Sequence, residues 1–323
     1  MHKNTLLITF FIIVLSSMFT SCIKNKQVEP TDQSDVKKPI VLNYNMSDIK
    51  ELEFFNNYVD KGIIENKGID EASGLAVSRS NPNRIWTHND KGGANRLYII
   101  GPNAESYGYF WIWGTGNRDW EDICIGPGPE NGKNYLYVGD MGDNDAVYNQ
   151  IIINRFIEPD ISGLDSIGIN RVDGSEVDRL IFVYPDGPRD AECLMIDPWT
   201  KDLYIVTKRE ARSSIYVARY PHSTTEVKTL EKIAEFPFNR ALAGDISADG
   251  KEIVVKTDRR LYYWKREMGE TILDALIRQP SLLPYFVEPQ GEAFAWKPNA
   301  DGYYTLSEKS GNVEPRLYYY SRK

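Results

Sequence analysis

Short apolar segments alternate along most of the chain with clusters of Gly, Pro, Asn and Asp. Some of these segments alternate apolar and polar residues, and others are continuously apolar, as half-buried and fully buried strands are. Only residues 269–278 have the 3.6-residue periodicity of an amphipathic helix. The pattern therefore predicts an all-β protein of many short strands with one short helix.

One motif recurs within this pattern: Glu, any residue, apolar, any residue, apolar, any residue, Pro. Its copies are 121–127, 192–198 and 292–298, with weaker copies at 73–77 and 244–250. A second apolar segment follows each copy, at 85–87, 136–138, 203–206, 253–255 and 303–306. A third follows at 96–98, 151–153, 214–216, 260–262 and 316–318, and a fourth in most units, as at 107–113, 179–184 and 230–236. Antiparallel strands in fours, repeated about every 45–55 residues, are typical of β-propeller blades.

The number of blades follows from the spacing of the motif. The copies at 121 and 192 are further apart than the others, which indicates an insertion around residues 160–176 or a degenerate sixth blade. We therefore predict five four-stranded blades and allow six. The last copy has three strands, and residues 51–64 are expected to supply its fourth and to close the ring. A solenoid and a β-sandwich are the structural alternatives.

The first residues have the features of a targeting segment. A polar, basic start precedes an apolar run at 6–19, which is shorter than an ordinary spanning helix of about 20 residues. The run ends in Phe-Thr-Ser-Cys, and small residues before a cysteine at this place resemble a bacterial lipoprotein signal. That resemblance implies cleavage after residue 21 and lipidation of Cys22; the alternative is an ordinary signal peptide. Residues 22–45 are expected to form a flexible tether and residues 46–323 one domain. The residue after the cysteine is Ile23 and not the Asp that retains some lipoproteins in the inner membrane, so the resemblance implies anchoring in the outer membrane.

Composition narrows the function classes. The chain has 323 residues, 38 Lys and Arg, 46 Asp and Glu, and a formal net charge of −8. This acidic balance argues against a nucleic-acid partner, which needs a basic surface. Three cysteines are too few for a disulfide scaffold, and Cys124 and Cys193 fall within first strands as small core residues. We expect a monomer.

Blade geometry predicts where chemistry can occur. Residues just before each first strand and just after each second strand should meet at one mouth of the central channel. The ligand-binding candidates at this mouth are Glu71, His88, Asp90, Asp119, Glu121, Asp140, Asp190, Glu192, Lys208, Arg209, Lys256, Glu292, Glu308 and Lys309. Asp122 and Asp245 belong to the same first strands.

Three interpretations of this mixed ring of charges stay open. In the first interpretation, the carboxylates are structural: they cap backbone N–H groups and pair with Lys208, Lys256 or Lys309. Alternatively, oxygen ligands such as Asp140, Asp143 and Asn144 bind Ca²⁺. In the third interpretation, Lys208, Arg209 and Lys256 hold an anionic substrate, and Glu121, Glu192 or His88 provides acid–base catalysis. No nucleophile elbow, phosphate loop or nucleotide fingerprint is present in the sequence.

Residues 86–90, 118–123 and 136–144 read Trp-Thr-His-Asn-Asp, Arg-Asp-Trp-Glu-Asp-Ile and Leu-Tyr-Val-Gly-Asp-Met-Gly-Asp-Asn. This series resembles a group of secreted bacterial β-propellers of poorly defined role and, more distantly, phytase-like and NHL-type propellers. The phytase-like resemblance implies calcium and acidic channel residues acting on phosphoesters, without a match for any single catalytic residue. The sequence thus favours an envelope-anchored propeller that binds a small polar or anionic ligand, with or without calcium. A calcium-assisted phosphoester or ester hydrolase and a protein–protein scaffold are the alternatives.

Overall fold

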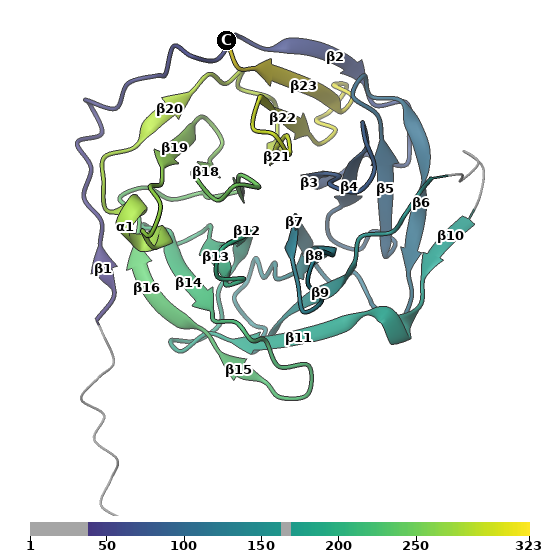
Figure 1. Ribbon diagram of the computed structural model, residues 1–323, viewed down its shortest axis with the longest axis horizontal. Helices are drawn as coiled ribbons and strands as arrows, with labels where there is room; N and C mark the ends of the chain where they lie inside the picture. The colour runs from purple at the N-terminus through teal and green to yellow at the C-terminus, as the bar shows by residue number, and fades with distance from the viewer. Residues whose placement is uncertain (1–37, 163–168) are drawn as a thin grey trace, which may run out of the picture. The chain divides into compact units, whose positions relative to one another are not determined.

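The computed structural model describes residues 38–162 and 169–323. They form five sheets, antiparallel in their inner strands, that are arranged as a ring (Figure 1). The innermost strand of each sheet faces the axis of the ring. These strands are β3 (Ala72–Val77), β7 (Trp120–Pro127), β12 (Ala191–Ile196), β17 (Ala243–Ile246) and β21 (Gly291–Trp296). Each contacts the next, and β21 contacts β3, so that the ring of inner strands is closed. The five-bladed propeller predicted from the repeat is confirmed.

The next two strands of each blade follow the inner strand along the chain and pair with it in antiparallel order. The second strands are β4 (Ile85–Asn89), β8 (Asn134–Asp140), β13 (Leu203–Thr207), β18 (Glu252–Lys256) and β22 (Gly302–Ser307). The third strands are β5 (Arg96–Ile100), β9 (Ile151–Ile157), β14 (Ser214–Ala218), β19 (Leu261–Lys265) and β23 (Arg316–Ser321). Each is near the segment that the repeat predicts.

The fourth strands lie toward the rim and come from two sources. In four blades they continue the chain, as β6 (Ser106–Ile112), β11 (Asp178–Val183), β16 (Glu231–Glu235) and β20 (Ser281–Leu283). In the last blade the neighbour of β23 is β2 (Val59–Ile63), which pairs with it in antiparallel register. The helix expected at 269–278 is the single turn α1 (Ile272–Leu276), which is capped by Thr271 and lies between β19 and β20.

Three blades have a fifth strand, which corrects the prediction of four strands per blade. These additional strands are β10 (Ile169–Val172), β15 (Lys228–Thr229) and β1 (Ile40–Val41), which pair in parallel with β6, β11 and β16. The inserted segment between the second and third motif copies contains β10 and the 3₁₀ turn η1 (Gly174–Glu176). The long spacing is therefore an insertion that extends the preceding blade, and not a sixth blade.

The folded domain begins earlier than residue 46, because the chain is already paired at β1. Leu42 and Tyr44 are buried while the residues between and beside them are exposed, which is the alternation of a strand packed on one face. The Tyr44 hydroxyl donates a hydrogen bond to the Leu276 carbonyl. Residues 38–45 thus belong to the propeller, and the remainder of the predicted tether and Cys22 lie outside the described residues.

The hydrophobic core is divided into five clusters, one at each boundary between neighbouring blades. This follows from sheets stacked face to face, since each sheet can bury both faces only against its two neighbours. Cys124 and Cys193 are free thiols that are 2% and 0% exposed within these clusters. Their interpretation as small core residues is confirmed.

Polar side chains also link the inner strands. A carboxylate oxygen of Asp122 accepts a hydrogen bond from the Leu194 backbone N–H at 2.9 Å, and Asp245 accepts one from the Trp296 N–H at 2.9 Å. The Asp122 carboxyl is fully buried and its other oxygen accepts the Ile123 N–H. These two aspartates therefore connect blades, as the structural interpretation of the acidic residues proposes.

Replacing Asp122 with alanine should lower the free energy of unfolding by about 1–3 kcal/mol, because buried N–H groups of Ile123 and Leu194 would lose their acceptors. Urea denaturation of the variant measures this loss. The exposed Glu53 provides the control, and Glu53→Ala should change stability by less than about 0.5 kcal/mol. Equal stability of both variants would show that the link between the blades contributes nothing.

Candidate functional site

The acidic residues of the channel mouth are placed there by β-bulges. The register of the innermost strand slips by one residue in four of the five blades, and the fourth blade has no slip. The extra residues are Ser73, Glu121, Glu192 and Glu292. A bulge redirects the side chain of its extra residue, which is why bulges are frequent beside active sites. These four residues occupy equivalent positions in the sequence repeat, and each of them also lies in a β-bulge.

Glu121 lies at the centre of a group of carboxylates. One oxygen each from Asp90, Asp119 and Glu121 lie within 4.8 Å of one another, and the same holds for Glu121, Asp190 and Glu192. All of these side chains are buried except the half-buried Asp90. The structure thus brings together five of the residues that the sequence placed at the mouth.

Burial and mutual repulsion change the proton affinity of this group. Burial, and then the charges of Glu192 and Asp90, raise the pKa of Glu121 well above its usual range. Burial also raises the pKa of Asp90 to about 7, and burial with the charge of Glu292 raises the pKa of Glu308 to about 9. Part of the acidic mouth therefore keeps its protons near neutral pH.

Basic side chains border the acidic group on the side of the later blades. Lys208 pairs with Glu192 and lies 3.8 Å from a Glu292 oxygen. Arg209 pairs with Asp190. Lys256 occupies the fourth blade, where the bulge is missing; it is fully buried, and burial lowers its pKa to about 8.

A cavity of about 420 Å³ opens beside these basic residues. Its lining includes Lys208, Arg209, Arg240, Asp258, Gln290 and Glu292. Arg240 pairs with Asp258, and both side chains remain substantially exposed to the cavity. The cavity is large enough for a small polar molecule and presents charges of both signs to it.

Some residues predicted for the mouth are engaged elsewhere. Asp143 accepts the backbone N–H groups of Val147 and Tyr148, so its carboxylate stabilises its own loop. Asn144 accepts a hydrogen bond from Arg209, and Asp140 accepts one from the Asp119 N–H. The three oxygens proposed as Ca²⁺ ligands in this loop are therefore already used as acceptors.

His88 does not face the mouth. Its imidazole is 0% exposed and packs edge-on against Trp120, with ring centroids 5.7 Å apart. Burial lowers its pKa to about 4. Gly74 makes room for the ring, since a Cβ at this glycine would lie 2.5 Å from Nε2. The hypothesis that His88 acts as a base on a ligand is therefore not supported.

Two other predicted residues lie at the edge of the mouth. Glu71 is exposed, and its charge contributes to raising the pKa of Asp90 and of Glu308. Lys309 pairs with Glu314, at 3.3 Å. The sequence did not identify Arg240 and Gly142 as site residues, because neither belongs to the charged positions of the repeat.

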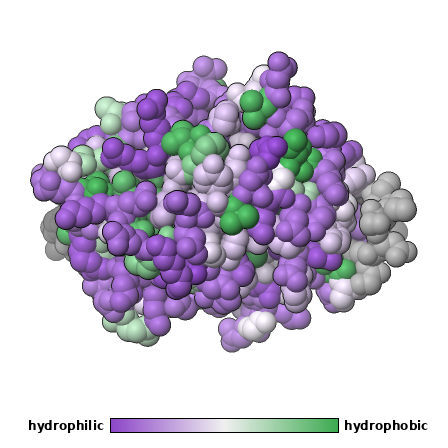
Figure 2. Space-filling model, turned by 90° about the horizontal axis from the view of Figure 1, so that it is seen from above, coloured by the Kyte–Doolittle hydropathy of each residue, from purple (hydrophilic) through white to green (hydrophobic). Residues whose placement is uncertain are grey.

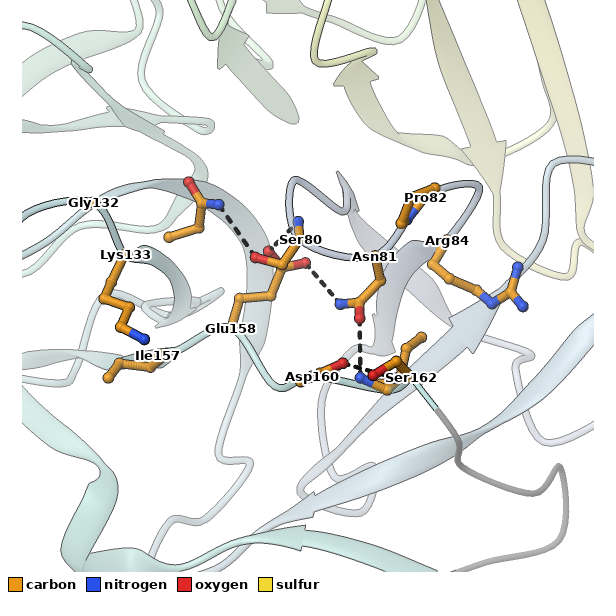
Figure 3. A pocket seen from close by; sticks show the side chains of 12 residues that line it. Ser80, Asn81, Pro82, Arg84, Gly132, Lys133, Ile157, Glu158, Asp160 and Ser162 are labelled. Atoms are coloured by element: carbon orange, nitrogen blue, oxygen red, sulfur yellow. Dashed lines mark hydrogen bonds between the residues drawn. The ribbon is translucent and has the colours of Figure 1, made fainter.

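A second cavity, of about 690 Å³, lies at the opposite ends of the first two blades (Figure 3). Glu158 is its buried acid, and this carboxylate accepts hydrogen bonds from Ser78, Ser80 and the Trp86 indole. The acid is thus fully used in joining the β3–β4 turn to the end of β9. The channel mouth, where Asp119 Oδ1 and Glu192 Oε2 are buried without a hydrogen-bond partner, is the stronger candidate site.

No protein-family model and no curated protein sequence matches the chain. Similar solved structures include the Pan2 WD40 domain of Neurospora crassa, which is 8% identical over 84% of this chain and 97% of that one, with a TM-score of 0.42. The RRP9 WD40 repeats are 10% identical over 77% and 79%, with a TM-score of 0.38. Hydrazine synthase of Kuenenia stuttgartiensis is 11% identical over 76% and 82%, with a TM-score of 0.40.

Similarity at this level carries no functional argument, and the propeller assignment depends on the closed ring of five sheets described above. The relation to phytase-like and NHL-type propellers stays a hypothesis. Within residues 38–162 and 169–323, no helix is long and apolar enough to cross a membrane.

Proposed function

We propose that this protein is an envelope-anchored propeller that binds a small polar or anionic ligand at the channel mouth. The observation that carries the proposal is the cavity of about 420 Å³ in which Lys208, Arg209 and Arg240 face Glu292 and Asp258. Guanidinium groups hold carboxylates and phosphates through paired hydrogen bonds. The nearby acidic group would select ligands with hydroxyl or cationic groups, or would act through a bound cation.

The anchoring part of the proposal comes from the sequence. The apolar run at 6–19 and Cys22 fit a lipoprotein signal, and acyl chains contribute about 0.8 kcal/mol per buried methylene to membrane binding. The outer membrane is the proposed location because Ile23 follows the cysteine. A propeller held there as a monomer would present its mouth to small solutes.

Thermal melting in the presence of inorganic phosphate, citrate, glucose 6-phosphate or glucose tests ligand binding. We expect at least one of these probes to raise the melting temperature. Arg240→Met should weaken the binding of that probe at least about tenfold, because the variant removes a cation from the cavity. Lys133→Met is the matched control, since Lys133 lines the other cavity. A melting temperature that no probe changes would favour the scaffold alternative.

The surface in Figure 2 bears on that alternative. It is mostly polar, and its apolar residues form small separate groups. Exposed apolar residues such as Tyr58, Phe286 and Val287 are present, but this view shows no single continuous patch of the kind that marks a docking surface.

A calcium-assisted hydrolase is the second candidate, and one observation favours it. Glu121 holds a proton well above the usual carboxyl range, while Lys208 pairs with Glu192 within the same group. Burial raises the pKa of Glu192 well above its usual range as well, and the charge of Lys208 opposes this rise. Carboxyls that share protons and have different neighbours can act as acid and base. Turnover of p-nitrophenyl phosphate that Glu121→Gln abolishes would favour this candidate over binding alone.

A further inference from the structure

Two groups of three carboxylates at the mouth share Glu121, and within each group one oxygen of every residue lies within 4.8 Å of the others. Oxygens that each lie roughly 2.3–2.6 Å from a calcium ion are at most about 5 Å apart. The observed spacing is therefore compatible with one ion at the centre of the oxygens. Spacing alone does not identify a site, because acidic groups also gather without a cation.

An independent observation comes from the hydrogen bonds. Asp119 and Glu192 are 1% and 3% exposed, yet Asp119 Oδ1 and Glu192 Oε2 are buried without any hydrogen-bond partner. Glu121, which is 3% exposed, belongs to both groups of three carboxylates and adjoins these two oxygens. Buried polar groups are nearly always paired, so these oxygens have the environment of ligands whose partner is a cation.

The backbone beside the group leaves room for these carboxylates to converge. Gly142 follows β8, and a Cβ at this position would lie 2.0 Å from Glu121 Oε1 and 2.7 Å from Asp119 Cγ. Any other residue would push the two carboxylates from their places. Gly142 thus leaves the space that the carboxylates of Glu121 and Asp119 occupy.

The basic residues nearby do not neutralise the inner oxygens. Lys208 pairs with Glu192 Oε1, Arg209 pairs with Asp190 Oδ2, and Lys91, 55% exposed, lies 3.3 Å from Asp119 Oδ2. Each cation therefore contacts one oxygen of its carboxylate. The second oxygens of Asp119 and Glu192 have no partner, whereas Asp190 Oδ1 accepts the Asp143 backbone N–H at 2.8 Å and keeps one lone pair for an ion. Glu121 has no such pair among the described residues.

We propose that Glu121, Asp190 and Glu192 bind one calcium ion at the channel mouth, beside Asp119, which belongs to the other group that contains Glu121. The ligand set is made of oxygens alone, without His or Cys, which favours a hard cation over zinc. Calcium suits the site better than magnesium, because ligands from separate blades do not impose regular octahedral geometry. The inference deepens the proposed function, since the ion would adjoin the ligand cavity and could hold an anionic group there. It also moves the calcium site from the Asp140–Asn144 loop to the bulged strands.

Calorimetric titration of the purified protein with calcium chloride, after treatment with EDTA and its removal, tests the site without any organic ligand. We expect one ion per chain, and we expect Glu121→Gln to weaken binding at least about tenfold, because a charged ligand becomes neutral. Gly142→Ala should weaken it similarly by displacing Glu121. Asp145→Asn, at an exposed aspartate near the mouth, should stay within about twofold of the unmodified protein.

The glutamine variant keeps the shape of the side chain, and its melting temperature in EDTA checks that it folds. Absence of calcium uptake by the unmodified protein, or equal affinity in Glu121→Gln, would overturn the site. Arg240→Met separates this result from the ligand proposal, since Arg240 lines the cavity and is not among the calcium ligands. Calcium binding without any binding of the organic probes would contradict the proposed function alone, and ligand binding without calcium would contradict this inference alone.

Discussion

Replacing Arg266 with methionine should lower the free energy of unfolding by about 3–5 kcal/mol, since it leaves the buried Asp197 without its cation. The two side chains are 2% and 1% exposed, and the guanidinium donates to both Asp197 oxygens at 2.8 and 3.1 Å. It also donates to the Glu270 carbonyl and lies 3.8 Å from the ring centre of Trp199. This one side chain therefore connects the third blade to the fourth. Urea denaturation measures the loss.

Two further variants show whether burial causes the effect. Arg316→Met removes the ion pair with Asp60, whose side chains are 35% and 42% exposed, and should cost less than about 1 kcal/mol. The double variant Arg266→Met with Asp197→Asn should recover part of the loss, because no unpaired charge stays buried. A loss in Arg266→Met no larger than in Arg316→Met would contradict this account.

The calcium-free protein should lose stability as the pH rises from 6.5 to 8. Asp90 and Asp245, with a pKa of about 7, and Glu308, with a pKa of about 9, keep protons in the folded state that the unfolded chain has already released. A folded state that binds more protons becomes less stable as the pH rises. The two described histidines have a pKa of about 4 in the folded state, so only the unfolded chain releases their protons near pH 6.5; they oppose the loss by less than about 1 kcal/mol together. Lys256 acts mainly above this window.

Denaturation in EDTA at the two pH values gives the size of the effect. Glu308 alone should contribute about 1–2 kcal/mol, allowing for its partial hydration. Glu308→Gln removes this contribution and should flatten the dependence. Calcium should flatten it as well, since an ion that neutralises the mouth favours the ionised carboxylates. Stability that stays constant or rises in EDTA would show that the mouth does not hold these protons.

The repeat predicted the parts of the fold that depend on local pattern. Each motif copy is an innermost strand, because the alternate apolar positions of the motif and the Pro at its end are local features that the sequence displays directly. The same alignment placed Glu121, Glu192 and Glu292 at equivalent positions, and the bulges show why these positions share a direction. Blade geometry was thus enough to bring the acids to one mouth.

The sequence could not predict the features that depend on partners distant in the chain. β1, β10 and β15 are two to four residues long and pair in parallel with other segments, so they have no alternation of their own to detect. The sequence pattern at His88 is compatible with a side chain that faces the channel mouth and with one that faces the core. Packing against Trp120 places the imidazole in the core, and this contact cannot be read from the sequence. Gly142 was not among the candidates because these were chosen for charged or polar side chains, although the site depends on the space that this glycine leaves.

The additional strands are distributed unevenly around the ring. β10 and β15 each leave their own blade to pair with the blade before it, and β1 pairs with the third blade, while the last two blades have only four strands each. β10 and β15 thus join the first blade to the second and the second to the third, and these blades carry Glu121, Asp190 and Glu192. The last two blades, which carry Lys256 and Glu292, are joined in another way: the segment after β1 pairs with Leu282 through Glu51 and with Arg322 through Phe55. Every blade thus has a partner strand or bridge from another part of the chain, so the cavity and the carboxylate group should keep a fixed relation to each other.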